Sequence, residues 1–146
     1  MPWLERAGVV WLGFCLAVTP SCKSDAERAE LAEVAHLVEH IDRLRRADNA
    51  DKEPLLGALS AAPCRGADAC ALKDLCVRAY RLHQDALDAI AAAKRRAAGD
   101  AAALDEAAKA REAKRLSAIE KDLTEAKALA ERCADEQVRV MRSKLM

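Results

Sequence analysis

The 146-residue chain is poor in aromatic side chains, with two Trp, one Phe and one Tyr. Three of these four lie within the first 14 residues, so Tyr80 is the only aromatic residue in the rest of the chain. Aromatic rings form stacking platforms and much of the lining of ligand pockets. Their scarcity argues against a cavity for a sugar, a nucleobase or haem, and it leaves the core to Leu, Val, Ile and Ala.

An excess of charge is also missing, because 24 Lys and Arg balance 24 Asp and Glu. Phosphate binding needs an excess of basic residues, so we expect no nucleic acid as a partner. Glycine and proline, which interrupt helices, occur only five and four times, and this favours long helices. No glycine-rich phosphate loop or nucleophile elbow is found, so neither catalysis nor a cofactor is expected.

The longest uncharged stretch lies close to the N-terminus and begins with the run of residues 7–19 (AGVVWLGFCLAVT). A membrane-spanning helix needs about 20 apolar residues, and a shorter run in this place is typical of a signal peptide. Residues 19–22 (TPSC) then resemble the end of a bacterial lipoprotein signal, in which small residues precede a cysteine. The resemblance covers only the N-terminal segment, and it departs from the family's pattern at Thr19, where Leu is usual, and at Pro20.

This resemblance implies cleavage after Ser21 and attachment of diacylglycerol to the thiol of Cys22. The expected organisation is a signal peptide over 1–21 and a mature helical domain over 22–146. A lipid with more than one chain implies stable attachment to a bacterial membrane. By analogy with lipoprotein sorting, Lys23 favours the outer membrane. Only this residue separates the anchor from the first helix signal, so the domain is expected to lie close to the bilayer, facing the periplasm or the exterior.

Apolar residues recur at helical spacing along most of the mature domain and predict an all-α fold. Ser24 and Glu27 fit a capping box at the start of the first helix. Pro54 fits the first turn of a short helix, and Gly99-Asp100 predicts the end of one long helix and the N-cap of the next. The main predicted helices cover about residues 24–47, 68–98 and 100–144.

The two longer predicted helices carry seams that alternate steps of three and four residues, the repeat of coiled-coil packing. With a very short connection they form a long antiparallel hairpin, within a small three-helix bundle. The seams comprise Leu72, Cys76, Ala79, His83, Ala86, Ile90 and Ala93, and then Leu116, Ile119, Leu123, Ala126, Ala130, Cys133, Gln137 and Val140. Opposite charges four residues apart support an exposed face of the last helix, in the pairs Asp105/Lys109, Lys121/Glu125 and Asp135/Arg139.

The last predicted helix is the longest, so its C-terminal end is expected to project beyond the other helices. This end is either a frayed terminus or a surface for a protein partner or self-association. Its apolar residues are Val138, Val140, Met141, Leu145 and Met146.

The six cysteines divide according to the predicted signal peptide. Cys15 leaves with the signal, and Cys22 takes the lipid. The others are expected to form two disulfides in an exported protein: Cys64, Cys70, Cys76 and Cys133.

Of the three possible pairings, a Cys70–Cys76 bridge is excluded if both residues lie in one helix, since six residues span about 9 Å along the axis. In a hairpin that turns at residues 99–100, facing residues have numbers that sum to about 199. Cys70 and Cys133 sum to 203, against 209 for Cys76 and Cys133. This register favours Cys70–Cys133 with Cys64–Cys76. The other pairing stays open, because Cys76 and Cys133 lie on seams whereas Cys70 lies on a flank.

Metal binding is the main functional alternative. His36 and His40 are four residues apart, with Glu33 and Glu39 beside them, and imidazoles at this spacing can share a metal ion. Their place on a polar flank also fits solvated surface histidines, and a diiron centre would need a second ligand pair. The cysteines, spaced C-x5-C-x5-C, lack the C-x2-C of zinc and redox sites. We expect His83, which lies on a seam, to be a satisfied interior histidine.

The sequence therefore predicts a lipid-anchored, disulfide-stapled, all-α envelope protein with a structural or protein-interaction role. The alternative is a periplasmic metal-binding protein that uses His36 and His40.

Overall fold

The structure, a computed structural model, describes residues 24–100 and 105–145, without the side chains of residues 99, 100 and 145. Throughout these ranges the fold is all-α and contains no strand, as the sequence predicts. The predicted signal peptide, which includes Cys15, and the predicted lipidation site Cys22 lie outside the described residues. The elements are α1 (Asp25–Arg46), a 3-10 turn η1 (Asn49–Asp51), α2 (Lys52–Ala61), α3 (Ala67–Asp100) and α4 (Glu106–Leu145).

The predicted capping box begins α1. The Ser24 hydroxyl accepts a hydrogen bond from the Glu27 N–H at 3.2 Å, and the Glu27 carboxylate accepts one from the Ser24 N–H at 2.6 Å. These two bonds satisfy N–H groups that have no partner inside the helix. The first helix therefore begins where the capping box of Ser24 and Glu27 predicts. One face of the helix is buried, with the side chains of Val34, Leu37, Ile41 and Leu44.

Short polar contacts hold α2 and the segment that follows it. Lys73 of α3 donates through Nζ to the carbonyl oxygen of Ala62, at the C-terminal end of α2, at 2.9 Å. The carboxylate of Glu33 in α1 accepts from the backbone N–H groups of Arg65 and Gly66 at 2.6 and 3.3 Å. The chain is thereby fixed to α1 just before α3 begins.

The predicted N-cap of the next helix at Asp100 is wrong, because α3 includes Gly99 and ends at Asp100, and the next helix begins only at Glu106. A glycine inside a helix costs only about 1 kcal/mol relative to alanine, and the alanine-rich α3 includes Gly99 as its penultimate residue. Asp105 caps the next helix instead, and its carboxylate accepts from the Ala108 N–H at 2.6 Å. The connection therefore lies farther along the chain than the sequence predicts.

This later connection changes the register of the hairpin. The observed register is defined by three pairs of residues that bind each other across α3 and α4: Asp68 with Arg139, Cys76 with Cys133, and Arg96 with Glu112. Their numbers sum to 207, 209 and 208, against the 199 expected for a turn at residues 99–100. The helices are shifted relative to the predicted register by more than one helical turn.

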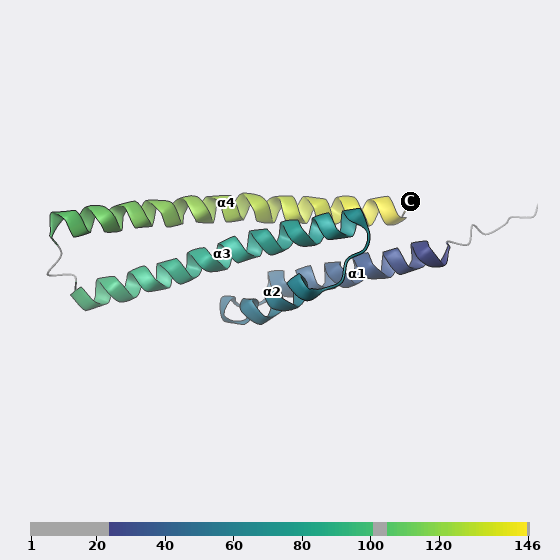
Figure 1. Ribbon diagram of the computed structural model, residues 1–146, viewed down its shortest axis with the longest axis horizontal. Helices are drawn as coiled ribbons and strands as arrows, with labels where there is room; N and C mark the ends of the chain where they lie inside the picture. The colour runs from purple at the N-terminus through teal and green to yellow at the C-terminus, as the bar shows by residue number, and fades with distance from the viewer. Residues whose placement is uncertain (1–23, 101–104, 146) are drawn as a thin grey trace, which may run out of the picture.

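Figure 1 shows α3 and α4 running antiparallel, with α1 and α2 beside only the half where α3 begins and α4 ends. The C-terminal end of α4 thus lies beside α1 instead of projecting alone, and Val140 is fully buried. The opposite end of the hairpin, near the connection, is the part that extends past α1 and α2. The predicted projecting end is therefore wrong.

The hydrophobic core also differs between the half of the hairpin that α1 and α2 cover and the half that they leave uncovered. Large buried side chains gather where four helices meet, and they include Leu37, Ile41, Leu44, Leu56, Leu59, Leu72, Cys76, Cys133 and Val140. In the half formed by α3 and α4 alone, the buried seam positions are alanines such as Ala86 and Ala93. Leu116, a predicted seam residue, is 50% exposed, because no third helix covers the hairpin there.

Candidate functional site

A polar bridge ties the C-terminal part of α4 to α1. Gln137 is 7% exposed, and its Oε1 accepts from Arg45 Nη2 at 2.8 Å while its Nε2 donates to Asp42 Oδ1 at 3.1 Å. Lys144 and Glu30 form an ion pair at 2.6 Å on the same side, which raises the pKa of Lys144. The sequence placed Gln137 on the seam, and its amide there binds two side chains of α1, Asp42 and Arg45.

An apolar groove lies beside this bridge. Its volume is about 210 Å³, and it is lined by Leu31, Val34, Ala35 and Val38 of α1 and by Met141 and Lys144 of α4. We call it the α1–α4 groove. Met141 is 40% exposed, and Val138 on the neighbouring part of α4 is 48% exposed. A contiguous apolar patch or groove on the surface marks a candidate contact site for another macromolecule.

Asp135, Val138 and Arg142 form the outer face of α4, where each of the three residues is exposed. They line a shallow surface hollow together with Arg139 and Ser143. The predicted ion pair of Asp135 with Arg139 is not formed, because Arg139 binds Glu136 at 2.5 Å and Asp68 at 3.0 Å. The outer face therefore presents one apolar side chain between an acidic and a basic residue.

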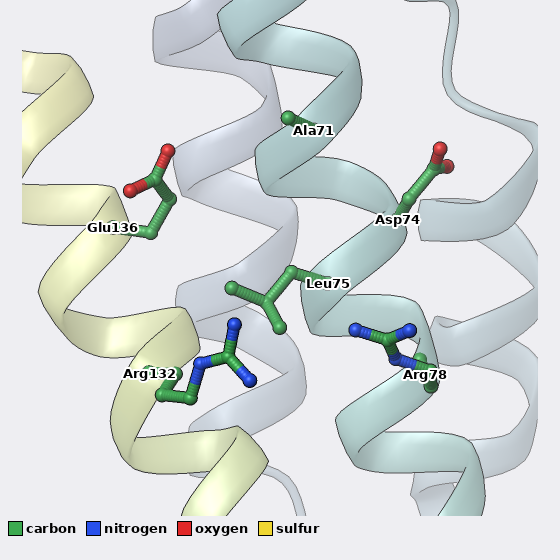
Figure 2. A pocket seen from close by; sticks show the side chains of 6 residues that line it. All are labelled: Ala71, Asp74, Leu75, Arg78, Arg132 and Glu136. Carbon is green, nitrogen blue, oxygen red and sulfur yellow. The ribbon is translucent and has the colours of Figure 1, made fainter.

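A second hollow, of about 520 Å³, lies between α3 and α4 and is lined by Ala71, Asp74, Leu75, Arg78, Arg132 and Glu136. Figure 2 shows Arg78 and Arg132 reaching from opposite helices toward the space beside Leu75. Hydrogen bonds from Arg139 lower the pKa of Glu136, so this carboxylate is ionised at neutral pH and is held by an arginine. The lining offers no nucleophile with an adjacent base, so this hollow supports no catalytic assignment.

His36 and His40 face each other on one side of α1. Their Nε2 atoms are 3.1 Å apart, and the rings meet edge to face with centroids 4.5 Å apart. Desolvation, followed by the neighbouring His36 and Arg43, lowers the pKa of His40. The nearby Glu39 is paired with Arg43 at 2.5 Å. Within residues 24–100 and 105–145, no group of three or more His, Cys, Asp or Glu side chains could hold a metal ion.

His83 lies partly buried on α3, away from this pair. Its Nδ1 atom is buried and makes no hydrogen bond within the described part of the chain. Burial, with a smaller effect of Lys52, lowers the pKa of His83 and so favours the neutral ring. The expected interior position is thus partly right, but the expectation of a satisfied ring is wrong at Nδ1.

The four cysteines of the described chain form two disulfides, as expected from their number. The pairs are Cys64–Cys70 and Cys76–Cys133, with Cα atoms 5.2 and 5.1 Å apart. The favoured pairing, Cys70–Cys133 with Cys64–Cys76, is therefore wrong. It rested on the incorrect register of the hairpin, whereas the seam positions of Cys76 and Cys133 pointed to the observed bridge.

The fold and these bonds define a disulfide-stapled, all-α protein whose second bridge crosses a long helical hairpin. Comparison with known proteins adds nothing to this class, because no family model, no curated protein and no solved structure matches the chain. None of the helices in the described ranges has an apolar stretch long enough to cross a membrane.

Proposed function

We propose that the protein is exported, carries a lipid on Cys22, and acts in the bacterial envelope as a structural and protein-binding element without catalysis. Residues 7–22 support export and lipidation through their resemblance to a lipoprotein signal. The two disulfides are compatible with an oxidising compartment outside the cytoplasm. The outer membrane is the favoured membrane.

The observation that carries the binding role is the exposed apolar surface at one end of the bundle. The start of α1 and the end of α4 lie at this same end (Figure 1), and the α1–α4 groove lies between these helices. A lipid on Cys22 would hold this end near the bilayer, because only Lys23 and Ser24 separate the anchor from α1. Partners would then meet the protein at the membrane surface.

The anchor is tested by the intact mass of the full chain, purified from membranes of a Gram-negative host and alkylated with and without reduction. We expect a species that begins at Cys22, carries a lipid increment, and exposes four alkylated thiols only after reduction. A matched Cys22→Ala variant should lose the lipid increment and leave the membrane fraction. A wild-type product without lipid, or with freely alkylated thiols, would contradict the proposed location.

The partner that we propose for the outer face of α4 is a second copy of this chain. Asp135 and Arg142 flank Val138 at spacings that place all three on one side of the helix. When two such helices pair antiparallel about a two-fold axis near Val138, Asp135 of one copy faces Arg142 of the other. The exposed Val138 and Met141 side chains are buried at the same time, which supplies an apolar contribution.

A charge swap tests this pairing by sedimentation of the oxidised protein over a concentration series. We expect wild type to form dimers and both Asp135→Arg and Arg142→Asp to weaken them, because each single change places like charges opposite each other. The double variant, Asp135→Arg with Arg142→Asp, should restore dimers. Its failure to do so, or a wild type that is monomeric at every concentration, would overturn the two-fold contact while leaving the anchor unaffected.

A further inference from the structure

We propose that His36 and His40 form a two-histidine site on α1 for a divalent transition-metal ion, with Cu²⁺ bound most tightly, then Ni²⁺ and Zn²⁺. The inference is independent of the envelope role, since it rests on the geometry of one helix. It assigns a ligand to the only two side chains of the described chain whose imidazole rings meet.

The distance between the two Nε2 atoms carries the argument. A metal bound to two imidazoles at about 2.0 Å holds the nitrogens about 2.8 Å apart in square-planar geometry and about 3.3 Å apart in tetrahedral geometry. The observed separation is 3.1 Å, which lies between these values. Small rotations of the two rings would therefore bring both lone pairs to one ion without any movement of the helix.

The protonation states also fit. At 3.1 Å one neutral ring donates a hydrogen bond through Nε2 and the other accepts it. Metal binding requires the donor ring to carry its proton on Nδ1 instead, a tautomer shift that exchanges one proton with water and releases none overall.

The surroundings decide what kind of site this is. Glu39 is engaged by Arg43, and Glu33 accepts from the backbone N–H groups of Arg65 and Gly66, so neither carboxylate is a free ligand. Water would complete the coordination, and the site would stay open to solvent. An open site with two imidazoles follows the general order of affinity for divalent metals, in which copper exceeds nickel and zinc.

Titration of the untagged, oxidised full chain with Cu²⁺, Ni²⁺ and Zn²⁺, each used alone, tests the site. We expect one ion per chain and the affinity order given above. His36→Ala or His40→Ala should each weaken copper binding roughly 100-fold, because the second ligand acts at a high effective concentration. The matched control is His83→Ala, which removes the remaining histidine of the chain and should leave the affinity unchanged.

Electron paramagnetic resonance of the copper-loaded protein gives an independent readout. Two imidazole nitrogens should couple to Cu²⁺ in wild type and one in either single variant, while circular dichroism shows that the helices are retained. Equal affinity in wild type and in the His36→Ala/His40→Ala variant would overturn the site. A stoichiometry of one ion per two chains would also overturn it, because the two ligands would then come from different molecules.

Discussion

Replacing Cys76 and Cys133 together by alanine should lower the free energy of unfolding by about 4 kcal/mol. The bridge joins residues 57 positions apart, and its removal frees a long loop in the unfolded chain. Both cysteines are fully buried in the core where the four helices meet, so the loss of two sulfur atoms adds a packing term of the same sign. Against a total stability of about 5 to 15 kcal/mol for a typical domain, this is a large fraction.

The other disulfide provides the matched control. Cys64 and Cys70 are only six positions apart, and removing their bridge should cost about 2 kcal/mol in the same chain-entropy estimate. Urea unfolding of the oxidised wild type and of the two double-alanine variants measures the difference. Equal losses for the two pairs would show that loop length does not set their contributions. A loss below about 1 kcal/mol for Cys76 and Cys133 would contradict the cross-hairpin bridge.

Leu37→Ala should destabilise the protein by about 3 kcal/mol. Leu37 lies on α1 and is fully buried in the cluster formed with α2, α3 and α4. Truncation to alanine removes two methyl groups and the Cγ methine from the buried core and leaves a cavity. Because alanine and leucine are both strong helix formers, the change measures packing of α1 instead of helix propensity.

Leu116→Ala is the control for this second prediction, since it makes the same chemical change on another helix. Leu116 is 50% exposed in the part of the hairpin that α1 and α2 do not cover, and its truncation should change stability by less than about 0.5 kcal/mol. Denaturant midpoints of the two variants give the comparison. Similar losses at both positions would mean that the far half of the hairpin is covered, contrary to the arrangement in Figure 1.

For the candidate sites, the sequence predicted some features, whereas others depend on the tertiary structure. The spacing of His36 and His40 was evident from the sequence, because four residues bring two side chains to one side of any helix. That their Nε2 atoms lie 3.1 Å apart depends on the two ring orientations, which the spacing does not specify. The α1–α4 groove could not be predicted, since Leu31 and Met141 come from helices that lie far apart in the sequence.

The sequence alone determined the all-α class, the capping box at Ser24 and the use of four cysteines in two disulfides. These features depend on contacts within a few residues or on the number of cysteines. Tertiary structure decided the register of α3 against α4, and with it the partner of Cys133. A seam that repeats every 3.5 residues presents apolar side chains again after each slide of seven, so periodicity leaves the register open. Only the place where α3 ends and α4 begins, together with the cover that α1 and α2 provide, selects one alignment.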